Sequence, residues 1–163
     1  SQRALREIYL RGFRICVERA RPRTVMTSYN KINGQWAHYS YDLATTILRG
    51  EWGYEGLVIT DWWMRYAPDP LFAHLADSAT RVRAQVDVLM PGGRTYTSTR
   101  AEGHDDSVLA CYDPDDDSGE HLTLGELQRT ARNVLRMALT TRALAGTTTE
   151  SAPAGPAAAA VEG

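Results

Sequence analysis

A continuous apolar run at residues 57–60 constrains the fold of this chain more than any other feature. It reads Leu-Val-Ile-Thr, follows the breaks at Gly53 and Gly56, and leads directly into Asp61. Apolar runs without alternation are typical of parallel strands that are buried on both faces. The run therefore predicts a parallel sheet, with Asp61 at the end of one of its strands.

Similar short runs alternate with amphipathic segments along the chain. Strands are expected at residues 24–29, 57–60 and 86–90, a turn at 30–34, and helices at 3–20, 41–50, 71–85 and from Leu124 onward. Thr123 and Glu126 fit a capping box at the start of the last helix, whose apolar face is expected to hold Leu124, Leu127, Ala131, Val134, Leu135 and Ala138. Alternation of this kind indicates right-handed βαβ units of an α/β fold.

Three strands cannot close a barrel of eight, so two architectures are open: a small open α/β layer, or part of a larger (β/α)₈ barrel. The chain has 163 residues, of which 43% are hydrophobic and 23% charged, which fits a globular domain. Its Ala/Pro/Thr-rich end, residues 147–163, is expected to be a disordered tail. The chain does not start with Met, and we expect it to begin inside a longer protein.

Charge and cysteine usage exclude several classes of function. The formal net charge of −2 gives no electrostatic reason to expect nucleic acid or an anionic membrane surface as partner. No apolar run approaches the roughly 20 residues of a membrane-spanning helix. Neither the two cysteines nor the four histidines show metal-ligand spacing, so no metal site is expected.

Asp61 is the sharpest chemical signal. In parallel α/β folds, active groups lie at the C-terminal ends of strands, where the loops gather. Trp62 and Trp63 follow Asp61, and aromatic rings beside a carboxylate suit a sugar, whose C–H faces pack on rings while its hydroxyls need acceptors. The pattern alone leaves a second interpretation open, in which Asp61 caps the following helix or binds a backbone N–H.

Six ordered segments carry a family resemblance. They are Val-Met-Thr-Ser-Tyr-Asn at 25–30, Asn-Gly at 33–34, Ile-Leu-Arg at 47–49, Glu-Trp-Gly-Tyr-Glu-Gly at 51–56, Val-Ile-Thr-Asp-Trp at 58–62 and Asp-Val-Leu-Met-Pro-Gly at 87–92. Together they resemble glycoside hydrolase family 3, densely over residues 1–93 and loosely over 121–142. The resemblance implies a partial TIM (β/α)₈ barrel in residues 1–146, comprising the last three β/α units and a preceding helix.

The resemblance also implies a chemistry. Family members are retaining exo-acting hydrolases, many of them β-glucosidases, which release a terminal sugar through a covalent intermediate. Their nucleophilic Asp matches Asp61, the Trp that lines the sugar subsite matches Trp62, and the Met and Tyr beside the sugar match Met26 and Tyr29. A donor such as the Tyr29 hydroxyl would help to keep Asp61 ionised. Two carboxylates and water suffice for this reaction, so no metal or organic cofactor is implied.

Part of the family pattern is not in this chain. The Lys-His segment and the sugar-binding Asp and Arg would lie on earlier strands, and the general acid is usually a Glu of a second domain. The acidic residues between Asp113 and Glu120 are interpreted as a solvated charge run. We therefore expect a β-glycoside substrate and a second domain as partners of the parent enzyme, and no hydrolysis by this chain alone. The alternatives are a non-catalytic or degenerate sugar-binding piece, and a small α/β binding domain of another class.

A partial barrel predicts self-association. Its missing neighbours leave strand edges and apolar faces unpaired. The isolated chain is expected to oligomerise, aggregate or stay partly molten when measured by size-exclusion chromatography with light scattering and by thermal melting. A sharp two-state melt from a clean monomer would contradict this.

Overall fold

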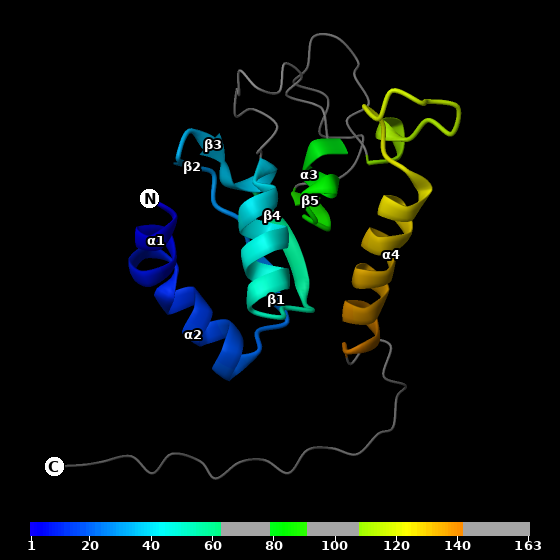
Figure 1. The fold of residues 1–163 in the computed structure, drawn as a ribbon. Coiled ribbons are helices and arrows are strands. Elements are labelled where there is room, and N and C mark those ends of the chain that lie inside the picture. Colours follow the sequence, from blue (N-terminus) through cyan, green and yellow to red (C-terminus); the bar gives the residue numbers. More distant parts are fainter. Residues whose placement is uncertain (63–78, 91–107, 142–163) are drawn as a thin grey trace, which may run out of the picture.

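A three-stranded parallel sheet forms the centre of the molecule (Figure 1). The computed structural model describes residues 1–62, 79–90 and 108–141. The strands are β1 (Thr24–Met26), β4 (Leu57–Trp62) and β5 (Val88–Met90), in the spatial order β1-β4-β5. Both neighbouring pairs are parallel, which confirms the predicted parallel sheet.

Helices of several kinds connect and flank the strands. They are α1 (Gln2–Ala4), η1 (Leu5–Tyr9), α2 (Arg11–Ala20), η2 (Ala37–Tyr39), η3 (Asp42–Glu51), α3 (Ala79–Arg83), η6 (Leu109–Cys111) and α4 (Leu124–Leu139). The helix predicted at 3–20 is interrupted by one wide π turn, in which the Leu10 N–H donates to Leu5 O at 2.8 Å. Residues 71–78 and 147–163, predicted as helix and tail, lie outside the described residues.

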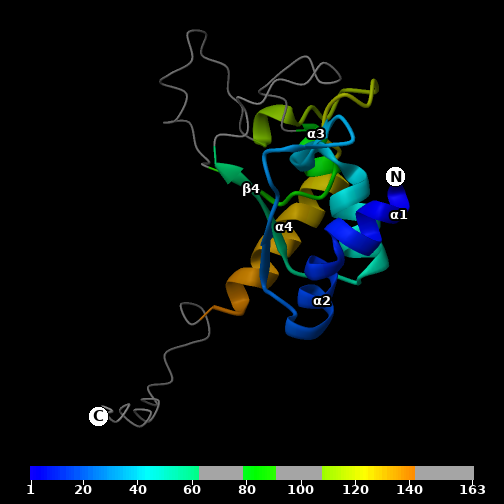
Figure 2. The ribbon, with the colours of Figure 1, turned by 90° about the vertical axis from the view of Figure 1, so that its left-hand side faces the viewer.

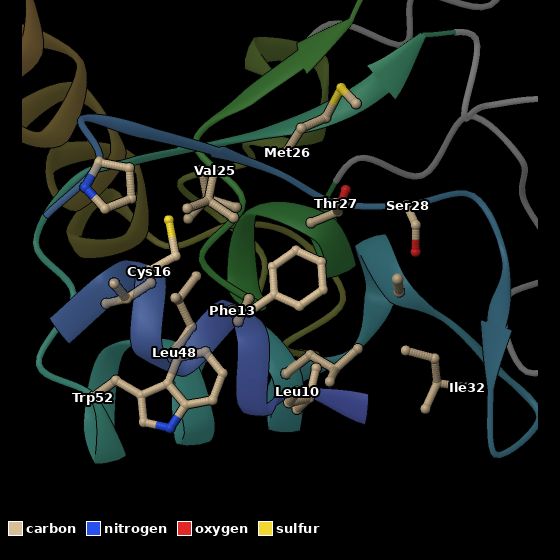
Figure 3. Close-up of a pocket in the computed structure, with 16 residues that line it drawn as sticks. Leu10, Phe13, Cys16, Val25, Met26, Thr27, Ser28, Ile32, Leu48 and Trp52 are labelled. Atoms are coloured by element: carbon tan, nitrogen blue, oxygen red, sulfur yellow. The ribbon is translucent and has the colours of Figure 1, made fainter. Parts of the chain in front are cut away.

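The two faces of the sheet differ in burial. Val25, Val58 and Leu89 pack against α2 and η3 in a core that also holds Val17, Ala44, Leu48, Tyr54 and Val86. Figure 2 shows α2 and η3 together on one side of the strands. Successive strand residues face opposite ways, and Figure 3 shows the side chains of Val25 and Met26 on opposite sides of β1.

The opposite face carries the row Met26, Ile59 and Val88, which are register partners across the three strands. Ile59 and Val88 are half-buried, and Met26 is 53% exposed. The described residues therefore cover this face only in part, and we call it the open face of the sheet.

A β-hairpin replaces the end of the first predicted strand. The strand predicted at 24–29 ends at Met26, and β2 (Lys31–Ile32) pairs antiparallel with β3 (Gln35–Trp36). Asn33 and Gly34 between them have φ values of 53° and 88°, which confirms the predicted turn. Two consecutive residues with positive φ make the hairpin turn whose twist matches antiparallel strands. The two hairpin strands were not predicted, because each is only a dipeptide.

The capping box of α4 is confirmed, but its predicted apolar face is wrong. The Glu126 N–H donates to Thr123 Oγ1 at 3.2 Å, and the Thr123 N–H donates to the Glu126 carboxylate at 2.9 Å. Of the predicted face, Leu124, Ala131, Val134 and Leu135 are exposed. The buried side chains are the polar Thr130 and Asn133, because Asn133 meets a buried charge. Of the predicted face, Leu127 packs against the apolar cluster of Ala79, Val82 and Leu122.

That charge is the carboxylate of Asp87, directly before β5, whose side chain has no exposed area. Its Oδ2 accepts from Arg49 Nη2 at 2.6 Å and from the Val58 N–H at 2.9 Å. Its Oδ1 accepts from Asn133 Nδ2 at 2.8 Å. Asp87 thereby joins η3, β4 and α4.

Neutralising Asp87 should destabilise the fold strongly. In Asp87→Asn the buried Arg49 guanidinium loses its counter-ion, and breaking such a pair costs about 3–5 kcal/mol. The melting temperature of the full-length parent enzyme, followed by circular dichroism, should fall by several degrees. The control Glu55→Gln removes only the exposed pair with Arg136 and should change little. Equal melting temperatures of Asp87→Asn and Glu55→Gln would contradict the stabilising role of the Asp87 carboxylate.

Acid should weaken the start of α4. Burial raises the pKa of Glu126, but hydrogen bonds from Arg83 and Thr123 lower it by more, so the pKa lies below its ordinary value of 4.5. A depressed folded pKa contributes stability above the unfolded value and loses it as pH falls through the folded value. The difference in melting temperature between wild type and Glu126→Gln should shrink below about pH 4.5. The exposed carboxylate of Glu120 provides the control, because Glu120→Gln should not reproduce this profile.

Candidate active site

The C-terminal ends of β1 and β4 meet at one edge of the sheet. Beyond β1, the Thr27 N–H donates to Ile59 O at 2.8 Å, and the Asp61 N–H donates to Thr27 O at 3.2 Å. The parallel ladder therefore continues past Met26, with Thr27 opposite Thr60. This arrangement brings the segments that hold the candidate site residues to the same edge.

Asp61 lies within β4 rather than after it. It is two residues beyond Ile59, so strand alternation places it on the open face, on the same side as Met26. Its side chain is half-buried, and its Oδ1 accepts from the Trp62 N–H at 2.6 Å. Because Trp62 continues the strand, Asp61 does not cap a helix at this point. The bond from the Trp62 N–H is, however, the backbone contact that the alternative interpretation of Asp61 also included.

A bulge follows on the other side of β4. Ile59 pairs with Val88 and Trp62 pairs with Met90, so β4 spans three residues where β5 spans two. Bulges of this kind re-aim side chains and are frequent beside active sites. Here the bulge falls on Thr60 and Asp61.

Exposed apolar and aromatic groups accompany the carboxylate. Trp62 is 47% exposed, Met26 53% and Tyr29 63%, so all three offer surface to a ligand. Within the described part of the chain, the Tyr29 hydroxyl makes no hydrogen bond to Asp61. Its role as a donor to Asp61 stays a prediction, and Trp63 lies outside the described residues.

The acidic segment before α4 offers no obvious second catalytic group. Asp113, Asp115, Asp117 and Glu120 are exposed, as a solvated charge run would be. Hydrogen bonds from Ser118 and His121 hold the pKa of Asp116 far below its usual range. That carboxylate stays ionised, whereas a general acid must carry a proton.

A cavity of about 190 Å³ lies between α2, β1 and η3 (Figure 3). Its lining is mostly apolar, with Phe13, Leu48 and Trp52 among its residues, and it opens on the helix-covered side of β1. Asp61 does not line it. Of the candidate site residues, Met26 is among those that line it, so the cavity is a gap in the packing under α2 that extends to the end of β1.

Residues 1–62, 79–90 and 108–141 contain no group of three or more His, Cys, Asp or Glu side chains placed to hold a metal ion. None of their helices has the length and apolar character needed to cross a bilayer.

Comparisons with known proteins identify the family to which this parallel sheet belongs. Residues 1–108 match the family model described as the glycosyl hydrolase family 3 N terminal domain. The chain therefore belongs to glycoside hydrolase family 3, and its mixed α/β structure with a parallel sheet is part of that family's barrel domain.

Its relatives are β-glucosidases. The chain is 42% identical over 145 residues to a β-glucosidase of Ruminococcus albus, covering 89% of this chain and 14% of the relative. A β-glucosidase structure from Paenibacillus barengoltzii is 42% identical with a TM-score of 0.70, covering 94% of this chain and 16% of that one. β-Glucosidase 3B of Thermotoga neapolitana in complex with glucose is 34% identical with a TM-score of 0.67, covering 85% and 17%. The chain thus spans a small part of each relative.

Proposed function

We propose that this chain is a segment of a longer retaining β-glucosidase and supplies the last three β/α units of its (β/α)₈ barrel. Three parallel strands joined through helices support this placement, since a barrel repeats that unit. The small share of each relative that the chain covers also supports it. Residues 1–146 would form the partial barrel and residues 147–163 a tail.

Asp61 acts as the nucleophile in this proposal. One carboxylate oxygen, Oδ1, is held by the Trp62 N–H, which orients the group and leaves Oδ2 to attack the anomeric carbon. As the Oδ2–C1 bond forms, the bond from C1 to the aglycone oxygen breaks, and that oxygen takes a proton from a general acid. Water then hydrolyses the glycosyl-Asp61 ester, with the former acid acting as base. The observation that carries the proposal is the half-buried position of Asp61 at the edge of the open face.

The exposed side chains around Asp61 define the sugar subsite. Trp62 would pack against a sugar face, and Met26 and Tyr29 would border the ring from the end of β1. The Thermotoga neapolitana relative is described in complex with glucose, which supports a terminal β-linked glucose as the substrate.

The general acid would come from another part of the longer protein, because a retaining mechanism needs two carboxyl groups about 5–5.5 Å apart. The described residues supply only Asp61 at this edge of the sheet. This chain alone would therefore not hydrolyse glycosides. No metal or organic cofactor takes part in the proposed steps.

Among the described residues Asp61 is the one carboxylate at this edge of the sheet, which also fits one alternative. The chain would then be a non-catalytic or degenerate piece of such an enzyme that binds sugar at most. The coding sequence upstream of Ser1 separates the two: in-frame strands of the same family support the enzyme, and a start codon directly before Ser1 supports the alternative.

Replacing Asp61 tests the mechanism in the full-length parent enzyme. Asp61→Ala should lower kcat on an aryl β-glucoside by on the order of 10⁴-fold or more, since the covalent step is lost. Azide should partly restore turnover and yield the α-glycosyl azide, because the small anion replaces the carboxylate. A 2-deoxy-2-fluoroglucoside should label the wild-type enzyme on the peptide that contains Asp61, detected by mass spectrometry.

The control is Asp117→Asn, which removes an exposed carboxylate of the segment before α4 and should keep wild-type kcat. Full activity of Asp61→Ala, or labelling of another carboxylate, would contradict the proposed role of Asp61 as the nucleophile. Glucose binding by calorimetry without any turnover in the parent would establish the non-catalytic alternative.

A further inference from the structure

The bulge in β4 leaves the backbone of β5 with an unusual hydrogen bond. Between the pairs Ile59–Val88 and Trp62–Met90 the two strands are out of step by one residue. A bulge disrupts the ladder locally, so the donors beside it need other acceptors. The Met90 N–H finds one in a side chain, because it donates to Thr60 Oγ1 at 2.8 Å.

Thr60 is suited to this bond by its burial. The residue is 1% exposed, so water cannot replace its hydroxyl as the acceptor for the Met90 N–H. A buried N–H that loses its partner carries the full desolvation penalty. The hydroxyl therefore fixes how β5 lies against the bulged part of β4.

The opposite side of β4 is held by backbone bonds. Ile59 O accepts from both the N–H and, at 3.3 Å, the Oγ1 of Thr27, and Thr27 O accepts from the Asp61 N–H. The peptide units on either side of Thr60 are thus tied to β1. At the same position along β4, the Thr60 side chain forms a hydrogen bond to β5.

We propose that Thr60 is a positioning residue, whose hydroxyl sets the bulge and thereby the direction in which Asp61 presents its carboxylate. The inference rests on the proposed role of Asp61 as nucleophile. The conformation of a bulge governs the direction of the side chains that it carries, and Asp61 directly follows Thr60. A misplacement of about 1 Å at a reacting group can cost roughly 10²-fold in rate.

The test uses three substitutions in the full-length parent enzyme. Thr60→Val keeps the shape and removes the hydroxyl, Thr60→Ala removes it without placing a methyl group against the Met90 N–H, and Thr60→Ser keeps it. The matched control is Thr130→Val, because Thr130 is a buried threonine of α4 whose hydroxyl has no hydrogen-bond partner among the described residues.

Thr60→Val and Thr60→Ala should each lower kcat by on the order of 10²-fold with KM changed less than threefold, since the nucleophile and not the subsite is disturbed. Thr60→Ser and Thr130→Val should stay within about threefold of wild type, as no positioning bond is lost. The rate of the pre-steady-state burst on a dinitrophenyl glucoside should fall, because formation of the glycosyl enzyme is the slowed step. A purely structural role would lower the amount of active enzyme, counted by fluoroglucoside labelling, and not the rate per active site.

Wild-type kcat per active site in both Thr60→Val and Thr60→Ala would overturn the inference, as would an equal loss in Thr60→Ser. These outcomes leave the proposed function standing if Asp61→Ala remains inactive and azide-rescued. Activity of Asp61→Ala would instead remove the proposed function itself. Should Thr60→Val fail to fold, the inference is tested by comparing kcat per active site of Thr60→Ala with that of Thr60→Ser.

Discussion

The buried carboxylate of Asp87 is the contact on which the arrangement of this segment depends. Moving a charge out of water costs several kcal/mol unless it is paired and fully hydrogen-bonded. Asp87 meets that requirement only when three elements converge: η3 brings Arg49, β4 brings the Val58 N–H, and α4 brings Asn133. The charge thus fixes which way a helix, a strand and a second helix face one another, a geometric demand that apolar packing alone does not make.

The contacts of Asp87 also help to position the edge of the sheet where Asp61 lies. By bonding the Val58 N–H, Asp87 sets the register of β4 against β5 at the base of the sheet, and the strands then run to the bulge that holds Asp61. Apolar packing of Val58 against α2 and η3 secures the other side of the strand. A carboxylate on so rigid a support keeps its direction, which a nucleophile requires. The described residues cover the open face beside it only in part, and the chain spans only 14% and 16% of the lengths of two of its β-glucosidase relatives.

Sequence patterns predicted several elements because their signals are local. The apolar run of β4, the turn at Asn33 and Gly34, and the box of Thr123 and Glu126 each depend on neighbouring residues, and all three are confirmed. The face of α4 was predicted wrongly, because helical periodicity cannot show that the helix meets a buried aspartate. A charged residue inside the apolar run at 86–90 was a signal that polar partners were needed, although not which ones.

The sequence by itself determined the three strands of the central sheet, the parallel order that their alternation with helices implies, the family, and the place of Asp61 near a strand end. These follow from residue types at short spacing and from six ordered segments. Tertiary structure alone decided that Asn133 and Arg49 share one carboxylate, that Asp61 continues the strand instead of capping a helix, and that Thr60 bonds across to Met90. Such contacts join residues 30 or more positions apart, and only the register of packed strands brings them within hydrogen-bond distance.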